Sequence, residues 1–364
     1  MSLTNFRTLG RSGLVISPLT LGTMTFGTEG WGSGKDESRA VFDAYVEAGG
    51  NSIDTADLYS VGHSEEMLGE FIAERSLRHR LVLATKSGFN RHKGDPNAGG
   101  NGAKAINDGV EASLRRLKTD HIDLYWQHVW DMVTPAEEVL ETMGNLVRAG
   151  KIRYFGLSNV PSWYVAKMAT LAGAYRVPGP SALQLEYSLT ERNIELEYLP
   201  AAREFGLGVL PWSPLSGGFL SGKYRREDID PTVEAGKSSP DSAPANDLGR
   251  LRKPNPSSAN RFSERNWKIL DVLREVAAEV GRPPAQVALA WACGRSGITS
   301  PILGASRLDQ LLDNIASLDI ALTPEQMDRL TTASAPKAAY PARIFSPDMN
   351  RMVFGGTTVS GWHA

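Results

Sequence analysis

Two kinds of segment alternate along the chain. Short apolar or β-branched runs, as expected for buried strands, are each followed by a stretch in which apolar residues recur at helical spacing. This alternation is typical of parallel strands joined by crossover helices. Eight runs fit it, at residues 19–22, 51–55, 81–86, 122–127, 152–158, 182–186, 208–212 and 299–304. The pattern therefore predicts an α/β fold of the (β/α)8 or TIM-barrel type.

Two of the expected helices begin with residues that are typical of helix N-terminal caps. At residues 134–137 and 323–326, a threonine precedes a proline, and an acidic or amide side chain follows at the third helical position. A threonine hydroxyl can accept hydrogen bonds from the free N–H groups of a first helical turn, and proline is favoured at its first position. We therefore expect Thr134 and Thr323 to cap helices.

Several segments do not fit this alternation of strands and helices. Residues 6–17 indicate two short strands around a glycine-containing turn, a β-hairpin that would plug the N-terminal end of the barrel. Residues 93–103, rich in Gly and Asn, predict a mobile rim loop. The proline-rich stretch at about 225–262 predicts a long lid or locally disordered loop. Both long loops are expected at the C-terminal face of the barrel.

The end of the chain loses the helix and strand patterns. Residues 334–364 predict an irregular tail, which nevertheless carries the aromatic residues Tyr340, Phe345, Phe354 and Trp362. A purely solvated tail would carry fewer, so we expect packing over the barrel mouth or against a second subunit. A barrel at about 18–330 with this tail predicts a single domain over 1–364. The sequence leaves the oligomeric state open, a homo-oligomer included.

Composition narrows the function. The 39 basic and 41 acidic residues give a net charge of -2, so no overall field favours nucleic acid or an anionic membrane as partner. Neither a signal-peptide pattern nor an apolar run of about 20 residues is present, which predicts a cytoplasmic protein. The lone Cys293 lies in an apolar run and is expected to be buried. The six histidines show neither HxH nor HExxH spacing, so no metal site is expected.

Polar side chains capable of chemistry follow neighbouring predicted strands. Asp54 ends the second strand and Tyr59 comes five residues later, Lys86 ends the third, and His128 follows the fourth. Each alone has an ordinary explanation as a turn cap, a solvated strand end or a core aromatic. Together they favour an active site, because the carboxyl ends of barrel strands converge on one face.

This group suits proton delivery to a carbonyl oxygen that gains charge as hydride reaches the carbon. A phenol has an ordinary pKa of about 10, so it needs a nearby cation to act as an acid near neutrality. At about 4 Å and an effective dielectric of about 20, one unit charge is worth roughly 4 kcal/mol. We expect Lys86 to supply that charge to Tyr59, Asp54 to position the ammonium, and His128 to orient the substrate oxygen or pass a proton.

These residues resemble the signature of the aldo-keto reductase family, an Asp, Tyr, Lys and His tetrad on a (β/α)8 barrel. The similar segments cover about residues 5–330 and include NSIDTADLYSVGHSEEMLG at 51–69, LATKSG at 83–88, DLYWQHVWD at 123–131, GKIRYFGLSN at 150–159, LQLEYS at 183–188, WSPLSGGFLSGKY at 212–224 and PILGASRLDQLLDN at 301–314. The resemblance implies an NADP-dependent reductase of aldehydes or ketones, acting on a small-molecule carbonyl substrate with Tyr59 as proton donor.

The resemblance also implies where NADPH would bind, extended across the barrel mouth without a GxGxxG fingerprint. Asp54 would reach the nicotinamide ribose, and Trp212 would stack on the nicotinamide ring. Arg307 would pair with the 2′-phosphate, which favours NADP over NAD. Asp313 stands where many relatives have Glu, and its shorter side chain puts the adenine contact in doubt. The remaining implied contacts are Thr23, Met24, Ser158, Asn159, Gln184, Ser213, Pro214, Leu215, Gly217, Lys223, Gly304, Ser306, Gln310 and Asn314.

Four further residues fall on rim loops that relatives use to enclose substrate: Met24, Trp31, Phe89 and Trp130. An aromatic wall there would favour aldehydes with apolar or flat bodies, although each residue could equally pack a lid or the core. Two other functions stay open. One is a cofactor-binding regulatory partner of membrane channels with little turnover, although the forms resembling those subunits tend to lack the histidine found here at 128. The other is a lyase in which Lys86 forms a Schiff base.

Overall fold

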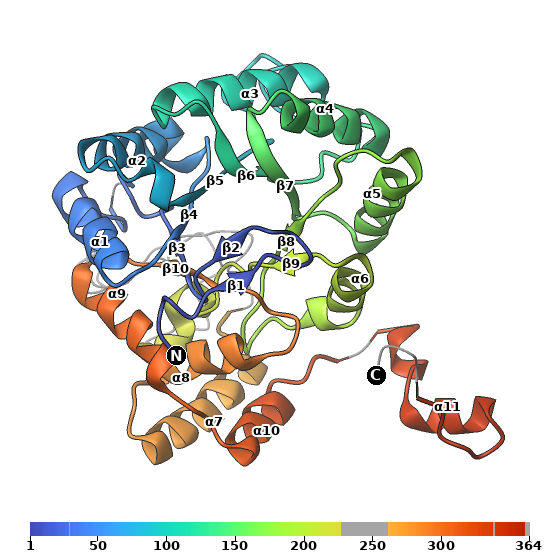
Figure 1. Ribbon diagram of the computed structural model, residues 1–364. Helices are drawn as coiled ribbons and strands as arrows, with labels where there is room; N and C mark the ends of the chain where they lie inside the picture. The colour runs from blue at the N-terminus through green and yellow to red at the C-terminus, as the bar shows by residue number, and fades with distance from the viewer. Residues whose placement is uncertain (29, 227–260, 338, 361–364) are drawn as a thin grey trace.

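The computed structural model describes residues 1–28, 30–226, 261–337 and 339–360. Eight parallel strands form a curled barrel inside a ring of helices (Figure 1). Their bounds are β3 Thr20–Gly22, β4 Ser52–Asp54, β5 Val82–Ser87, β6 Ile122–Gln127, β7 Ile152–Ser158, β8 Ala182–Gln184, β9 Gly208–Val209 and β10 Ile302–Gly304. All eight lie within or overlap the runs that the sequence predicted. The (β/α)8 fold is therefore confirmed.

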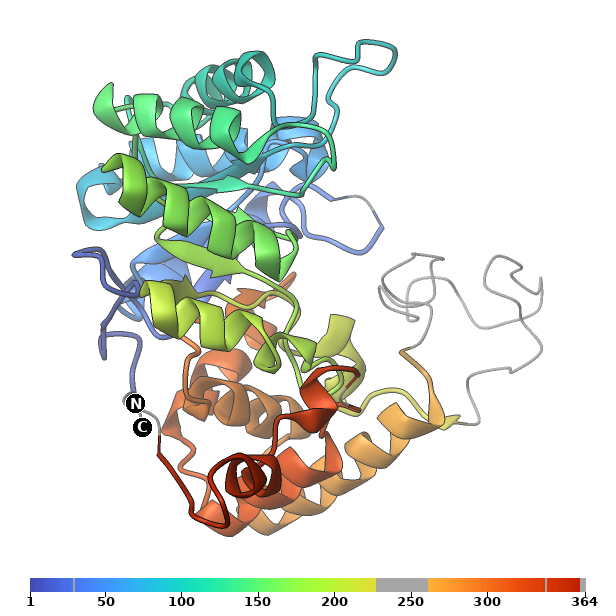
Figure 2. The same ribbon diagram turned by 90° about the vertical axis from the view of Figure 1, so that its right-hand side faces the viewer.

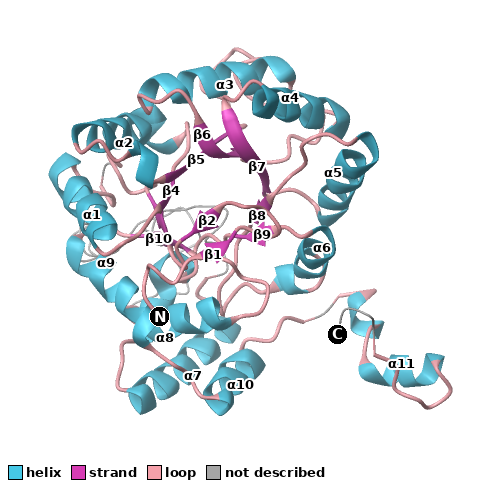
Figure 3. Cartoon of the chain, in the orientation of Figure 1, coloured by secondary structure: helices cyan, strands magenta, loops and turns pink. Residues whose placement is uncertain are grey.

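The strands follow one another in space as they do in sequence, in the order β10-β3-β4-β5-β6-β7-β8-β9. Backbone hydrogen bonds then link the two outer strands, from Ile302 N to Pro211 O at 2.8 Å and from Thr299 N to Val209 O at 2.8 Å. These bonds close the ring of strands seen in Figure 3. All carboxyl ends consequently lie at the same face of the barrel.

Helices connect successive strands and cover the outside of the barrel. They are α1 Lys35–Glu47, α2 His63–Glu74, α3 Ala103–Arg116, α4 Ala136–Arg148, α5 Ser162–Tyr175, α6 Tyr198–Phe205, α8 Pro284–Gly294 and α9 Leu308–Ile315. Further helices are α7 Glu264–Val280 and α10 Pro324–Ala333, which pack on each other, and α11 Pro347–Val353 in the tail. Short 3-10 turns are η1 Tyr59–Gly62, η2 Arg78–Arg80, η3 Asn193–Glu195, η4 Ser216–Ser221, η8 Ala316–Asp319 and η9 Ala342–Ile344.

The predicted hairpin is present and plugs the barrel. Strands β1 Arg7–Thr8 and β2 Val15–Ile16 pair antiparallel. Leu9 and Ile16 are buried in one apolar cluster with the inward-facing barrel residues Leu124 and Trp126. In Figure 2 the hairpin lies at the left end of the barrel, while the segments at 23–28, 30–34 and 88–102 project from the opposite end. One end is thus filled with apolar side chains, and the other remains available for a site.

The two predicted helix caps have different outcomes. Thr323 forms a full capping box with Gln326, as expected for α10. Thr134 does not cap α4, so that prediction was wrong: the helix starts at Ala136 after Pro135, and no side chain caps it. The hydroxyl of Thr134 donates instead to Asp131 at 2.6 Å, because that carboxylate already accepts the backbone N–H groups of Val133 and Thr134. A nearby charged acceptor outcompeted the helix end.

The described loops and tail partly match expectation. Residues 93–102 are irregular, and α3 begins at Ala103. Residues 227–260 of the second predicted loop lie outside the described residues, as does Trp362. The tail is not wholly irregular, since it contains η9 and α11. Its described part, residues 334–337 and 339–360, does not pack over the barrel mouth: residues 339–342 lie beside η3 and α6, and α11 stands apart from the barrel with Tyr340 and Phe345 exposed (Figure 1). Packing against a second subunit stays a prediction.

Two smaller expectations concern burial and membrane contact. Cys293 is buried as predicted, and burial raises the pKa of its thiol to about 12. Among the described residues, no helix combines the length and apolarity needed to cross a bilayer.

Candidate active site at the carboxyl ends of the strands

The four tetrad residues come together at one face of the barrel. Asp54 is the last residue of β4, Lys86 lies near the end of β5, and His128 directly follows β6. Tyr59 begins η1, five residues beyond Asp54. Since β4, β5 and β6 are neighbours in the sheet, their ends bring all four side chains into one group.

Lys86 is the centre of this group. Its side chain is fully buried, and its ammonium donates to three acceptors: the Asp54 carboxylate, the Thr55 carbonyl at 2.7 Å and the Tyr59 phenol oxygen at 3.1 Å. An ammonium has three hydrogens to donate, so all are used. The lysine is therefore held in a single position, with its charge beside the phenol.

Lys86 and Asp54 form a buried ion pair in which each residue stabilises the charged form of the other. Burial alone would lower the pKa of Lys86, but the Asp54 carboxylate and the Tyr59 oxygen outweigh it and raise that pKa above its ordinary value. Burial raises the pKa of Asp54, and the Lys86 ammonium opposes this. The Gln184 amide also donates to the second oxygen of Asp54 at 2.9 Å. Lys86 consequently stays a cation near neutral pH.

His128 is kept neutral beside the phenol. Burial lowers its pKa well below the ordinary value, and the positive charge of Lys86 lowers it further. The imidazole meets the Tyr59 ring edge-on, with the ring centres 6.2 Å apart, and meets Phe89 edge-on at 4.9 Å. Its Nδ1 is buried without a hydrogen-bond partner in the part of the chain described. A neutral imidazole here can orient a ligand oxygen without adding charge.

The backbone after Tyr59 is strained. Ser60, Val61 and Gly62 all have positive φ, at 49°, 57° and 91°. A β-branched residue in this region is rare, and such strain persists only where surrounding contacts impose it. The Ser60 hydroxyl supplies one such contact by donating to the Phe26 carbonyl at 2.9 Å. This hydrogen bond ties the turn that carries Tyr59 to the loop after β3.

The predicted nicotinamide contacts lie beside this group. Ser158 and Asn159 end and follow β7, and the Asn159 amide donates to the His128 carbonyl at 2.9 Å. The Trp212 indole donates to the Asn159 side chain at 3.3 Å. Thr23 follows β3 and is buried, and its backbone N–H donates to the Asp54 carbonyl at 2.9 Å. Polar contacts thus link the ends of β6, β7 and β9, and likewise those of β3 and β4.

The loop predicted to hold the pyrophosphate has an unusual backbone. Ser213, Ser216, Gly217 and Gly218 have φ of 54°, 54°, 65° and 96°. Successive left-handed residues turn backbone N–H groups toward one side and form concavities that suit anions. Pro214 is buried, Leu215 is half-buried, and the exposed Lys223 lies close to this loop, as its neighbourhood to Gly218 shows. Within the loop, the Ser216 N–H donates to the Ser213 carbonyl at 2.8 Å and the Gly218 N–H donates to the Leu215 carbonyl at 2.9 Å.

The predicted adenosine contacts are clustered at the start of α9. The Gln310 amide oxygen accepts from the Ser306 N–H at 3.0 Å, and Asn314 is buried, whereas Gly304 and Asp313 are exposed. Arg307 is exposed and forks onto Asp309, with both contacts at 3.0 Å. The guanidinium proposed for a 2′-phosphate is thus already paired with a carboxylate.

The four rim residues differ in what they contact. Phe89 lies against the His128 ring, as a substrate wall would require. Trp130 packs edge-on against Trp163 of α5 at 5.5 Å, so it also has a packing role. Met24 and Trp31 are half-buried on the loop after β3.

Sequence reasoning missed several residues that shape the site. Asp57 is buried two residues before Tyr59 and pairs with Arg91, in the loop after β5, at 3.2 Å. Glu186 pairs with Arg261, whose guanidinium also reaches Ser216 at 2.5 Å. Glu186 lies inside a segment that the sequence singled out, but its partner is distant along the chain, so no spacing pattern could reveal the pair. Within the described ranges, no group of three or more metal-ligating side chains is found.

Known proteins are similar to this chain over most of its length. The model of the aldo/keto reductase family matches residues 18–335. An oxidoreductase of Bacillus subtilis, YrpG, is 36% identical over 329 residues, covering 87% of this chain and 92% of its own. A Saccharomyces cerevisiae protein named as an aryl-alcohol dehydrogenase is 30% identical over 355 residues, covering 93% and 88%. A rice protein named as a voltage-gated potassium channel subunit beta is 31% identical over 329 residues, covering 89% and 95%. The chain belongs to the aldo/keto reductase family.

Proposed function

We propose that this protein reduces aldehydes or ketones to alcohols with NADPH, and that Tyr59 donates the proton. The observation that carries the proposal is the Lys86 ammonium, which is fully buried and lies 3.1 Å from the Tyr59 oxygen. A phenol next to a fixed cation can give up a proton at moderate cost, because the phenolate left behind is stabilised.

The residues present fit a nicotinamide cofactor. The left-handed run at Ser216–Gly218 suits its diphosphate, and the Trp212 indole, half-buried and held by Asn159, offers a flat face to the ring. Ser158, Asn159 and Gln184 are the candidates for the carboxamide, and the residues at the start of α9 for the adenosine. When bound, the nicotinamide would supply the hydride that reaches the carbonyl carbon.

The chain itself performs the proton half of the reaction. Tyr59 transfers its phenolic proton to the substrate oxygen, so the carbonyl becomes a hydroxyl group. Lys86 stabilises the resulting phenolate, and Asp54 keeps the ammonium in place through a charge-assisted hydrogen bond. His128, neutral because it is buried beside Lys86, donates a hydrogen bond that orients the substrate oxygen.

An aromatic aldehyde is the substrate class that the rim favours. Phe89 stands edge-on to His128, beside the atoms that would receive the carbonyl, and 40% of its surface is exposed. Aromatic rings prefer such edge or offset contacts with other flat bodies. The yeast relative carries a name that refers to aryl alcohols, which is consistent with this choice.

The Schiff-base alternative is disfavoured by the contacts of Lys86. A nucleophilic lysine must lose its proton and reach the substrate. Here the ammonium is buried, its pKa is raised, and its three hydrogens are donated to protein acceptors. Borohydride trapping of substrate on Lys86 would contradict the reductase proposal.

The regulatory alternative receives support from the rice relative named as a channel subunit. The complete tetrad, His128 included, favours turnover instead. Measurement of steady-state turnover distinguishes the two, because a regulatory protein would bind NADPH and consume almost none of it.

The test of the proton donor is Tyr59→Phe. With benzaldehyde as substrate, NADPH consumption should fall at least about 100-fold, the usual contribution of a general acid, while NADPH binding measured by fluorescence titration is retained. Tyr175→Phe, on the exposed face of α5, is the matched control and should leave the rate unchanged. Full activity in the Tyr59 variant would refute the assignment.

A further inference from the structure

Arg261 lies three residues before the start of α7 at Glu264, and it is buried, with 8% of its surface exposed. One terminal nitrogen donates to the Ser216 hydroxyl at 2.5 Å, and the other pairs with the Glu186 carboxylate. Its backbone is held as well, since the Asn266 amide donates to the Arg261 carbonyl at 3.1 Å. Arginine is rarely buried to this degree without specific partners.

Glu186 and Ser216, which both contact Arg261, belong to different strand extensions. Glu186 lies two residues beyond Gln184 of β8 and forms a parallel bridge with Trp212, which follows β9. Ser216 lies four residues beyond Trp212. One guanidinium therefore braces the two segments that carry the expected nicotinamide contacts and the loop expected to receive the diphosphate.

Ser216 is the residue in this loop that most needs external support. It is fully buried and has a φ of 54°, a conformation that residues with a side chain adopt reluctantly. Its hydroxyl contacts the Thr190 hydroxyl at 2.7 Å in addition to Arg261. Because Ser216 directly precedes Gly217, its conformation sets the direction of the Gly217 N–H, while the Gly218 N–H donates to the Leu215 carbonyl at 2.9 Å.

We propose that Arg261 is a positioning residue for the cofactor, which holds Ser216 and so keeps the Ser213–Gly218 loop in the conformation that accepts the diphosphate. Glu186 keeps the guanidinium in place by a charge-assisted contact. The proposal rests on the proposed function, because it assumes that a nicotinamide cofactor binds this loop. It assigns Arg261 no role in proton transfer, so its effect belongs to cofactor affinity.

The primary test is Arg261→Met, with NADPH affinity measured by fluorescence titration and kcat measured at saturating NADPH. The Kd for NADPH should rise at least about tenfold, since a charge-assisted hydrogen bond is lost, and kcat should stay within about twofold. Arg261→Lys should recover only part of the affinity, because an ammonium cannot fork between Ser216 and Glu186. Glu186→Gln, which removes the counter-charge but keeps the shape, should raise the Kd in the same direction.

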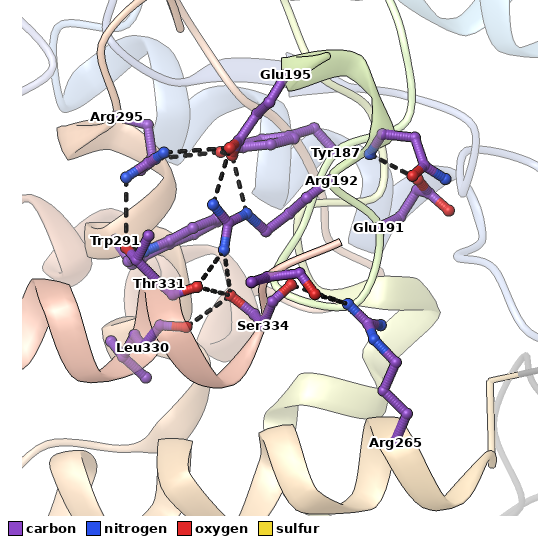
Figure 4. Close-up of polar contacts among 12 residues, drawn as sticks. Tyr187, Glu191, Arg192, Glu195, Arg265, Trp291, Arg295, Leu330, Thr331 and Ser334 are labelled. Atoms are coloured by element: carbon purple, nitrogen blue, oxygen red, sulfur yellow. Dashed lines mark hydrogen bonds and ion pairs between the residues drawn. The ribbon is translucent and has the colours of Figure 1, made fainter. Parts of the chain in front are cut away.

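Arg192 provides a matched control. It is also buried, at 4% exposed, and its guanidinium donates to both oxygens of Glu195, at 2.9 and 2.8 Å (Figure 4). Its guanidinium also reaches Ser334 at 2.8 Å, near the end of α10. Arg192→Met therefore removes a comparable buried ion pair, but one that braces α10. It should lower the melting temperature while leaving the Kd for NADPH within about twofold.

A double-mutant cycle separates positioning from direct contact with the cofactor. Ser216→Ala alone should weaken NADPH binding, and adding it to Arg261→Met should cause little further loss, because both remove the same contact. Additive losses would mean that Arg261 touches the cofactor itself and would overturn the proposal, as would equal losses in the Arg192 control. If the wild-type protein binds NADPH and Arg261→Met binds it equally well, this proposal alone fails. If the wild-type protein binds no NADPH, the proposed function fails with it.

Discussion

The ammonium of Lys86 donates to both the carboxylate of Asp54 and the phenol oxygen of Tyr59. The two charged side chains are buried: that of Lys86 is 0% exposed and that of Asp54 is 2% exposed. A buried ion pair of this kind contributes little net stability when intact. Removal of one partner is costly, because the other is left as an uncompensated buried charge.

Lys86→Met should therefore impair both folding and activity. We expect a loss of about 3–5 kcal/mol in the free energy of unfolding, the usual cost of breaking a buried pair, and a loss of nearly all reduction. The double variant Lys86→Met/Asp54→Asn should regain most of the stability but none of the activity. Urea denaturation checks the stability. A double variant as unstable as the single one would show that the stranded charge is not the cause.

Arg307 and Asp309 should influence cofactor preference in opposite directions. Arg307→Ala removes the expected partner of the 2′-phosphate and should weaken NADPH binding about tenfold or more, with a smaller effect on NADH. Asp309→Asn frees the guanidinium from a carboxylate that forks onto it at 3.0 Å. Since exposed pairs are weak, NADPH binding should tighten only about twofold to fivefold. Equal effects on both cofactors would remove the 2′-phosphate assignment.

Asp57 should make stability depend on pH. Burial, and then the nearby charge of Glu65, raises the pKa of the Asp57 carboxyl to about 7. Between pH about 4 and about 7 the folded protein therefore keeps a proton that the unfolded chain has lost, so this group's contribution to stability falls as the pH rises through that window. The upper limit of the change is about 4 kcal/mol, at about 1.4 kcal/mol per pKa unit.

The check is Asp57→Asn, with unfolding free energies measured at pH 5 and pH 8. The wild-type protein should lose stability relative to this variant on going to the higher pH. Asp108→Asn is the control, because the Lys104 contact holds the pKa of Asp108 below its ordinary value, outside this window. A difference between wild type and Asp57→Asn that does not change with pH would contradict the prediction.

Phe89 should discriminate between substrates by shape. Its ring meets His128 edge-on with centres 4.9 Å apart. Phe89→Ala should raise KM for benzaldehyde about twofold to tenfold, the range expected for losing one aromatic contact, and should hardly affect a short aliphatic aldehyde. Val133→Ala, on the nearby loop and 83% exposed, should change neither value. Equal changes for both aldehydes would assign Phe89 to general packing.

The strand runs predicted most of the barrel because their cause is local. Buried parallel strands must be apolar along their length, and crossover helices must present one apolar face, so both leave a record in consecutive residues. The capping box at Thr323 is local for the same reason. Thr134 shows the limit: it too is followed by a proline and, at the third helical position, by a side chain suited to a capping box, but its hydroxyl donates to the Asp131 carboxylate.

The sequence alone determined the eight-stranded barrel, the plug, and the face on which Asp54, Tyr59, Lys86 and His128 would meet, because strand order and strand ends follow from chain order. Only the tertiary structure decided which groups share a hydrogen bond: the third acceptor of Lys86 at Thr55, the Asp309 carboxylate on Arg307, and the bridge from Arg261 to Glu186. The physical reason is the separation along the chain between the residues that interact. A backbone pattern repeats over a few residues, whereas Arg261 finds Glu186 across 75 positions, where only the folded chain sets the distance.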